Sequence, residues 1–304
     1  MYSLLQLLRA AERTLQLAEM GRYELDALLL PTEDTVTVWD ICPDTDFEAL
    51  LVTDAMNRCV KAVAASTSAT LVFQCVAHSR PRALQLVRPV AGGGATLLLI
   101  EWLEIEQKNA RYALVFAARN GQRFKETRRL FLPALAKEDP TAPVSIMATT
   151  NGRFVLIGNS GVKALEVVDA RDSSGIARLA ASLPLYFELF AFSMGEADGK
   201  ELLAATERST STVHLLTVDI SSGVAALNPL TRLSSAESSQ QPNRVLLFGR
   251  DVLLGFRHAS SDSHSVKCIH ISGALLQKSQ LLRIERQVKI NCWRVKGEQV
   301  LLFD

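Results

Sequence analysis

Five basic side chains crowd one predicted hairpin, and they form the densest group in the chain that could bind a charged partner. They are Arg119, Arg123, Lys125, Arg128 and Arg129, with Glu126 as the one acidic residue among them. Grouped guanidinium and ammonium ions suit an acidic protein surface, or the phosphates of nucleic acid or of a phosphoinositide. Few aromatic residues lie nearby to stack on bases, so a protein partner is favoured over nucleic acid. Charge runs of this kind usually form a solvated rim without any partner, and that interpretation comes before either partner.

Residues that could carry out covalent or metal chemistry are sparse. Ser160 stands near Gly158 and Gly161, but the spacing differs from that of a nucleophile elbow, and the segment predicts a turn between two strands. The main histidine cluster comprises His258, Asp262, His264 and His270. Zinc usually requires four ligands, which this loop does not supply at suitable spacing. We therefore predict no catalytic residue, no metal ligand and no cofactor, and a protein that is not an enzyme.

The elements that would position these residues repeat along the chain. Between Val144 and Leu233 a unit of four short apolar runs occurs twice, and the third run of each copy ends in an aspartate, Asp169 and then Asp219. A repeat near 50 residues with four strands is typical of a propeller blade. A third such unit follows after the polar loop 234–243. The pattern predicts an all-β protein, a β-propeller of about six four-stranded blades, with seven as the alternative count.

One strand end carries a family resemblance. Thr37, Val38, Trp39, Asp40 and Ile41 resemble the third strand of a blade in WD-repeat propellers, which ends in Trp-Asp, and Asp169 and Asp219 are similar in position. The resemblance covers about residues 24–304 and is at the level of the fold. It implies a propeller whose loops bind other proteins, because WD-repeat proteins mostly act as scaffolds.

The chain ends after two strands of its last unit, at residues 288–303. Because an unpaired sheet edge promotes aggregation, another segment is expected to complete this blade. We predict that strands from residues 24–41 do so, and that a propeller domain of residues 23–304 is closed by pairing of N- and C-terminal strands.

Residues 1–22 are predicted to form a separate, short amphipathic helix. Ser3 and Gln6 match a capping box, Gly21 can end the helix, and leucine and alanine recur at helical spacing. Arg9 and Arg13 lie on its polar face. The apolar face either packs on the rest of the chain or docks on another subunit, with Arg9 and Arg13 as partner contacts.

Composition narrows the location and the partners. The 304 residues include 33 basic and 32 acidic side chains, for a net charge of +1, so there is no global attraction to nucleic acid or to an anionic membrane. Charged residues interrupt the first twenty positions, which excludes the core of a signal peptide. The longest apolar run, Ala95 to Ile100, is far shorter than the roughly 20 residues of a membrane span. Five scattered cysteines without a CxxC pair suit a reducing compartment. We expect an intracellular protein, cytoplasmic and/or nuclear, with no transmembrane segment.

These observations favour a non-catalytic protein–protein interaction scaffold, a subunit of a larger intracellular complex. Its partners would be other protein subunits, and a small-molecule substrate is not expected. One alternative is nucleic-acid or phosphoinositide binding through the basic hairpin. The other is a propeller hydrolase with a site in the central channel. That enzyme would need acidic residues or histidines on the inner strands of several blades, whereas predicted inner strands such as 144–150 are mostly apolar.

Overall fold

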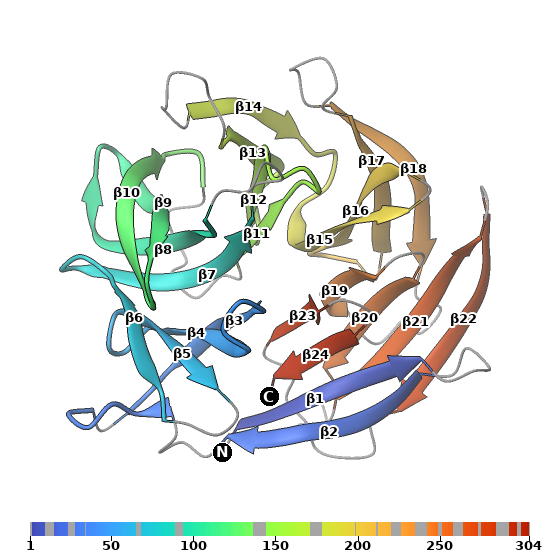
Figure 1. Ribbon diagram of the computed structural model, residues 1–304. Coiled ribbons are helices and arrows are strands. Elements are labelled where there is room, and N and C mark those ends of the chain that lie inside the picture. Colours follow the sequence, from blue (N-terminus) through green and yellow to red (C-terminus); the bar gives the residue numbers. More distant parts are fainter. Residues whose placement is uncertain are drawn as a thin grey trace. The chain divides into compact units, whose positions relative to one another are not determined.

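The chain forms two compact units of three sheets each. The computed structural model describes residues 2–9, 15–23, 28–33, 35–64, 68–88, 94–135, 144–170, 178–197, 199–210, 212–219, 226–234, 242–248, 251–257, 264–272, 275–283, 292–296 and 299–303. One unit comprises Met1–Pro140 with Asn291–Asp304, and the other comprises Thr141–Ile290. Every regular element with defined bounds in these residues is a strand, and each sheet has four strands (Figure 1). The predicted all-β class and the predicted number of four-stranded sheets, about six, are thus confirmed.

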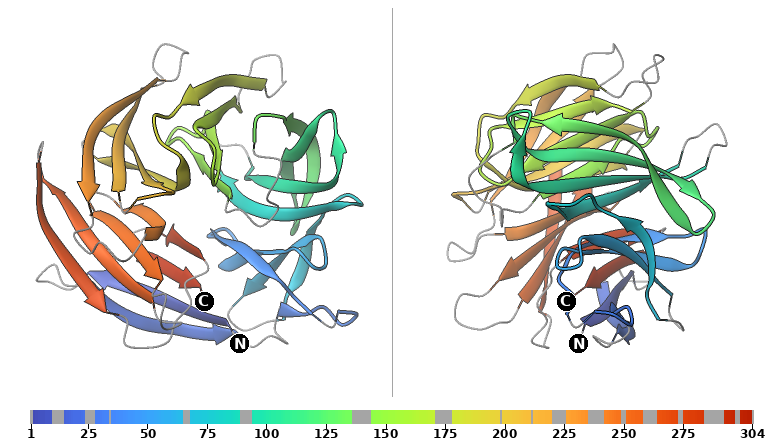
Figure 2. Two further views of the ribbon diagram at one scale, coloured as in Figure 1. Left: turned by 180° about the vertical axis from the view of Figure 1, so that it is seen from behind. Right: turned by 90° about the vertical axis from the view of Figure 1, so that its left-hand side faces the viewer.

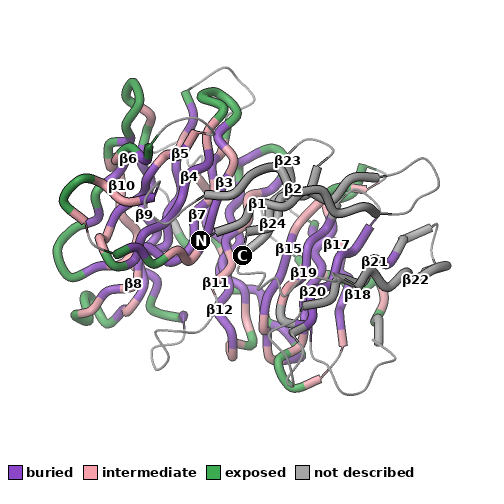
Figure 3. The backbone as a smooth tube through the Cα atoms, turned by 90° about the horizontal axis from the view of Figure 1, so that it is seen from below, coloured by how far each residue is buried: buried purple, intermediate pink, exposed green. Residues whose placement is uncertain are grey.

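The first unit contains three antiparallel sheets. In their order within each sheet, the strands are β23 (Cys292–Lys296), β24 (Gln299–Phe303), β1 (Tyr2–Arg9) and β2 (Leu15–Tyr23); β3 (Val38–Asp44), β4 (Ala49–Asp54), β5 (Cys59–Ala64) and β6 (Thr70–Gln74); and β7 (Ser79–Val87), β8 (Thr96–Gln107), β9 (Ala110–Asn120) and β10 (Arg123–Leu132). Continuous apolar runs build the centre of this unit. Long stretches of its strands are buried, which Figure 3 shows in purple. Leu97, Leu99 and Val115, from β8 and β9, are fully buried. They form one apolar cluster with Leu51 of β4 and Leu84 of β7. The apolar runs are continuous because strands that are covered on both faces need apolar residues at every position.

The second unit also contains three antiparallel sheets. Their strands are β11 (Val144–Ala148), β12 (Phe154–Asn159), β13 (Ala164–Asp169) and β14 (Arg178–Pro184); β15 (Leu189–Ala197), β16 (Lys200–Glu207), β17 (Thr212–Asp219) and β18 (Ala226–Ser234); and β19 (Pro242–Phe248), β20 (Asp251–Arg257), β21 (His264–Ser272) and β22 (Leu275–Arg283). The repeat predicted between residues 144 and 233 is therefore two consecutive sheets. Asp169 and Asp219 end the third strand of each, as the pattern indicated.

The N-terminal segment differs from the prediction. Residues 2–9 and 15–23 are the strands β1 and β2, which pair with each other, so the predicted helix over residues 1–22 is wrong. β1 also pairs with β24, and the dark blue N-terminal strands lie near the dark red C-terminal ones in Figure 2. Leu5 is opposite Leu302, and Leu7 is opposite Val300. The segment had a helical apolar spacing, but an unpaired edge strand gains more from a hydrogen-bonded neighbour than a local helix offers, and this pairing overrides local propensity.

Two further expectations are corrected at the start of the chain. Residues 2–23, rather than 24–41, supply the two strands that share a sheet with β23 and β24. Trp39 and Asp40 lie near the start of β3, which is the first strand of its sheet and not the third. The Trp-Asp pair therefore does not mark the strand end that it marks in WD-repeat proteins. Asp40 instead accepts the backbone N–H groups of Ile41 and Leu84, and so ties β3 to β7.

No helix in the described residues is long and apolar enough to cross a membrane.

Candidate functional site

The basic hairpin is the β9–β10 hairpin, and two of its five cations are turned into ion pairs within the protein. Arg119 Nη2 lies 2.5 Å from Asp44 Oδ2. Arg129 binds Glu101 Oε2 at 2.6 Å and Glu126 Oε2 at 2.8 Å, and its side chain is only 14% exposed. The two carboxylates outweigh the burial that would otherwise lower the pKa of Arg129, and they hold that pKa above its ordinary value. These two arginines are therefore already neutralised.

The other predicted partner contacts lie in different environments. Arg123 and Lys125 are exposed, and half-buried Arg128 lies 5.8 Å above the ring of Phe116. Arg9 ends β1, and Arg13 lies outside the described residues. Among the predicted histidine cluster, His264 and His270 are on β21, whereas His258 and Asp262 lie outside the described residues. The structure thus divides the basic group into paired and exposed members, and partner binding by the exposed ones stays a prediction.

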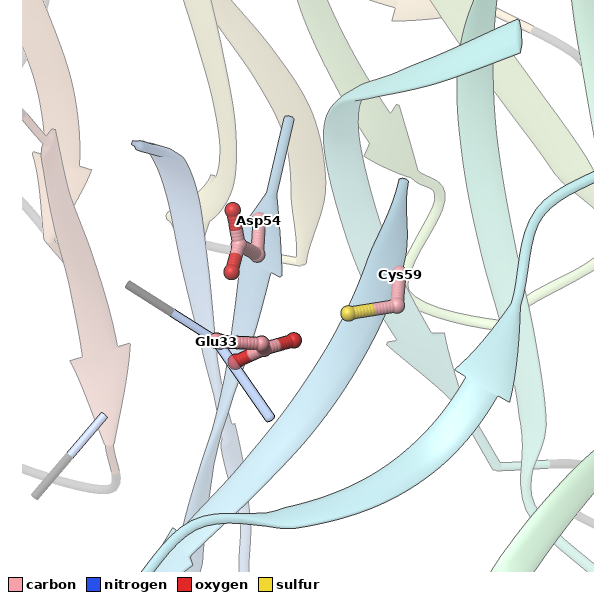
Figure 4. A group of neighbouring side chains, drawn as sticks. All are labelled: Glu33, Asp54 and Cys59. Atoms are coloured by element: carbon pink, nitrogen blue, oxygen red, sulfur yellow. The ribbon is translucent and has the colours of Figure 1, made fainter. Parts of the chain in front are cut away.

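A buried acidic cluster in the first unit has the composition of a metal site. Glu33, Asp54 and Cys59 bring ligand atoms within 4.8 Å of one another (Figure 4). However, the ammonium group of Lys61 already occupies the space between the carboxylates. Its Nζ donates to Asp54 Oδ2 at 2.6 Å, to the carbonyl of Leu28 at 3.0 Å and to Glu33 Oε2.

The chemistry of this cluster is that of a closed ion-pair network. The side chains of Lys61 and Asp54 are both 0% exposed, and the ammonium group has all three of its donors in use. Burial raises the pKa of the Cys59 thiol to about 12, so this sulfur is protonated near neutral pH. A divalent ion would have to displace a buried cation and ionise a buried thiol. We therefore assign this cluster to stability.

A second hydrogen-bonded cluster, in the second unit, ends at the surface. The Tyr186 hydroxyl lies 2.9 Å from His214 Nδ1, and His214 Nε2 lies 3.1 Å from Glu207 Oε2. Tyr186 is 50% exposed, whereas His214 is 2% exposed. The line of groups therefore runs from a partly solvated carboxylate, through a buried imidazole, to a phenol that faces solvent.

The sheet of β15 to β18 and the connector before it position these side chains. Glu207 is the last residue of β16, and His214 is the third residue of the paired strand β17. Tyr186 lies in the connector between β14 and β15, which is held in place because Leu185 N and Leu189 N donate to the carbonyls of Lys163 and Val162. The next residue, Phe187, stacks on the imidazole with ring centroids 3.8 Å apart, at an interplanar angle of 7°. Stacking on one side and hydrogen bonds at both nitrogens fix the orientation of the imidazole.

The partners of the imidazole also determine its protonation. A carboxylate only accepts, so Nε2 carries the hydrogen toward Glu207, and Nδ1 of the neutral ring then accepts from the phenol. Burial lowers the pKa of His214 below its ordinary value, although the hydrogen bond to Glu207 opposes the shift. His214 is consequently neutral near pH 7, and the lone pair on its Nδ1 accepts the hydrogen of the Tyr186 hydroxyl. This is the arrangement of a nucleophile, a general base and a residue that orients the base.

A cation lies beside the exposed end of this line. Arg232 is on β18 directly opposite His214 in the strand register, and its guanidinium lies 5.1 Å from the centroid of the Tyr186 ring. Arg232 is exposed, so its charge is available to an anionic group in solution. Tyr186, His214, Glu207 and Arg232 are together called the tyrosine site below.

The sequence interpretation missed the tyrosine site. Its residues are 28 and 7 positions apart, and they lack a known motif. One signal was present: Glu207 and His214 flank the turn between two predicted strands, where an acid and a base seven residues apart face each other. Tyr186 could not be found in this way, because the contact depends on how the connector folds over the sheet.

No family model matches the chain. No curated protein matches it either. Among solved structures, it is similar to a candidate 6-phosphogluconolactonase from Bacteroides fragilis, with a TM-score of 0.58 at 12% identity, covering 99% of this chain and 87% of the other. It is similar to virginiamycin B lyase from Staphylococcus aureus, with a TM-score of 0.52 at 10% identity over 100% and 99% of the two chains. A chain in a nidogen/laminin complex has a TM-score of 0.52 at 11% identity over 92% and 93%. The resemblance to propellers is thus confirmed at the level of the fold.

These structures correct the functional interpretation of the sequence. The expectation of a non-catalytic scaffold, and with it the expectation that the chain is not an enzyme, relied on the scaffold role of WD-repeat propellers. The same fold occurs in proteins named as a lactonase and a lyase. The lack of a linear catalytic motif was also a weak argument, because catalytic groups in folded proteins are recognised by geometry and not by sequence position.

Proposed function

We propose that the protein is a propeller-fold hydrolase that cleaves small carboxylate-bearing esters or lactones at the tyrosine site. The observation that carries this proposal is the half-exposed Tyr186, whose hydroxyl is bonded to a buried, neutral His214 that Glu207 orients. The hydrolase that the sequence offered as an alternative has its site in a central channel, whereas the hydrolase proposed here uses the tyrosine site. It also gives the protein a small-molecule substrate, which the sequence interpretation did not expect.

The residues support a two-step mechanism. In the first step, Tyr186 Oη attacks the carbonyl carbon of the ester while its proton moves to His214 Nδ1. The ester C–O bond then breaks, the leaving alcohol takes the proton from Nδ1, and the acyl group remains on Tyr186. In the second step, water attacks the acyl-tyrosine and gives a proton to His214 Nδ1. The carboxylic acid leaves, and the proton returns to the phenolate oxygen.

The neighbouring charges favour this sequence of steps. Glu207 stabilises the imidazolium that forms when His214 holds the proton, because its carboxylate lies 3.1 Å from Nε2. Arg232 supplies a positive charge beside the phenol, which favours both an anionic substrate and the negative oxygen of the tetrahedral intermediate. The proposal therefore predicts a preference for substrates with a carboxylate.

The test is hydrolysis of 4-nitrophenyl hydrogen succinate, with 4-nitrophenyl acetate as the uncharged comparison. Tyr186→Phe and His214→Asn are each expected to reduce kcat/KM by about 10²- to 10⁴-fold, the usual range for loss of a nucleophile's proton transfer. His78→Asn is the matched control, because His78 is 60% exposed and remote in sequence from the tyrosine site. Mass spectrometry of the acid-quenched protein is expected to find the succinyl group on Tyr186. Hydrolysis that survives in Tyr186→Phe would remove the proposal.

The proposal also includes the cellular compartment of the protein. Cys42, Cys59 and Cys75 are free and buried, which suits a reducing, intracellular compartment, cytoplasmic or nuclear. Any binding of other protein subunits or of nucleic acid would fall to the exposed cations Arg123 and Lys125.

A further inference from the structure

A cavity of about 290 Å³ opens between two sheets of the first unit, and the tyrosine site does not use it. Its walls come from β3 to β6 on one side and from the β9–β10 hairpin on the other. The space exists because small residues face one another across neighbouring strands. Ala49 is opposite Ala64, and Ala62 is opposite Leu51, where larger side chains would fill the gap. The volume suits a ligand of one or two rings.

Two aromatic rings and one guanidinium are among the groups that line this cavity. The Arg119 guanidinium carbon lies 4.5 Å from the centroid of the Phe47 ring and 4.7 Å from that of Phe124. Phe47 is 44% exposed, which is unusual for a ring that has apolar neighbours available. A flat apolar ligand would cover this ring and remove it from water.

The polar groups show which ligand chemistry fits. The charged residues that line the cavity are Asp44 and Arg119, and these two form an ion pair with each other. The cavity therefore offers no net charge to an ion. Arg119 Nε is nonetheless buried, and it has no hydrogen-bond partner among the residues that the structure describes. A buried donor left in this state is costly, and a ligand oxygen would relieve that cost.

We propose that this cavity binds an uncharged aromatic molecule with a carbonyl oxygen, of the carboxamide class, whose oxygen accepts from Arg119 Nε. The ring lies over the alanines and against Phe47 and Phe124. This inference is independent of the proposed hydrolysis, because none of its residues belongs to the tyrosine site.

The test is a titration of the whole, ¹⁵N-labelled protein with benzamide, and NMR measures the shifts of the backbone amide signals. Benzamide is expected to bind in the millimolar range and to shift the amide signals of Phe47, Ala62 and Arg119. Arg119→Lys keeps a cation for Asp44 but removes the Nε–H group, and is expected to weaken binding by about tenfold. Ala62→Leu fills the cavity and is expected to abolish binding, while circular dichroism checks that the sheets remain. Arg128→Lys, a charge-conserving change on the same hairpin, is the matched control and should bind as the wild type does.

Two comparison ligands separate the parts of the proposal. Toluene lacks the oxygen and benzoate carries a charge, and both are expected to bind more weakly than benzamide. Equal binding of toluene would show that Arg119 recognises nothing, and tighter binding of benzoate would identify an anion site instead. Absence of shifts at saturating benzamide, or unchanged binding in Ala62→Leu, would overturn the site itself.

Discussion

Two hairpins of the molecule place an acid and a base at the same positions and use them differently. In the β4–β5 hairpin, Asp54 ends the first strand and Lys61 is the third residue of the second. In the β16–β17 hairpin, Glu207 and His214 hold these same positions. Each pair is bonded across the hairpin. A third hairpin, β12–β13, also puts polar residues there, Asn159 and Glu166. The arrangement is therefore a recurring feature of the sheets.

The difference lies in what covers the base. Leu28 and Glu33 close over Lys61 and take its remaining donors, so no polar group of the pair is left for chemistry. The connector of Tyr186 and Phe187 lies over His214 and buries the ring, but the lone pair on its Nδ1 accepts from the hydroxyl of Tyr186, a residue that is half exposed. The pair itself is common to both hairpins, and the segment that covers it decides between stability and reactivity.

The largest effect should come from breaking the closed pair. Lys61→Met leaves Asp54 and Glu33 buried without their cation, and is expected to lower the free energy of unfolding by about 3–5 kcal/mol. His214→Asn, at the equivalent position, should cost only about 1–2 kcal/mol, because Glu207 is partly solvated and keeps water as a partner. Urea unfolding of both variants measures the contrast. Equal losses would show that the two hairpins play the same structural role.

The next effect concerns the orienting carboxylate. Glu207→Gln keeps the shape of the side chain but removes the charge that fixes the hydrogen on His214 Nε2, and kcat is expected to fall by about 100-fold. The free energy of unfolding should change by less than about 1 kcal/mol, since the amide still bonds the ring. Asp54→Asn is the matched change in the other hairpin, and should cost stability while leaving kcat unaltered. A loss of stability without a loss of activity in Glu207→Gln would reassign Glu207 to a structural role.

How far the sequence could predict these features follows from the range of the interactions. The strands of residues 144–233 were predicted because their apolar runs and turns are local, and every one of them is present. The segment of residues 2–23 was wrongly predicted because its partner, β24, lies at the other end of the chain. Trp39 and Asp40 were misplaced for the related reason that the strand order depends on where the first sheet begins.

The same limit applies to the sites. The charge of the basic hairpin is visible in the sequence, but the pairing of Arg119 with Asp44 and of Arg129 with Glu101 depends on contacts between strands. The tyrosine site depends on the fold of one connector. Burial also hides polarity from pattern arguments, since Lys61 is fully buried although lysine is among the residues most often exposed.

The smallest effect, and the sharpest separation of the two hairpins, should come from pH. Burial lowers the pKa of His214. Above about pH 6.5 the ring is therefore neutral in both the folded and the unfolded state, and its contribution to the free energy of unfolding is complete. As the pH falls below that value, the unfolded state takes up the proton first, and stability decreases by at most about 1.4 kcal/mol per pH unit. Hydrolysis should persist to below pH 6.5 and then decline as the base becomes protonated.

Lys61 should respond at the opposite end of the scale. Burial alone would lower its pKa, but the hydrogen bonds that Lys61 donates to Asp54 and Glu33 outweigh burial and raise it. The contribution of Lys61 to the free energy of unfolding is therefore complete below the ordinary pKa of lysine, and it is lost as the pH rises through the raised pKa. The free energies of unfolding of wild type and Lys61→Met should become equal only at strongly alkaline pH. Those of wild type and His214→Asn should approach each other as the pH falls. If His214→Asn kept a constant difference in free energy of unfolding from wild type between pH 4 and 8, the folded and unfolded states would protonate His214 at the same pH, and the lowered pKa of the buried imidazole would be refuted.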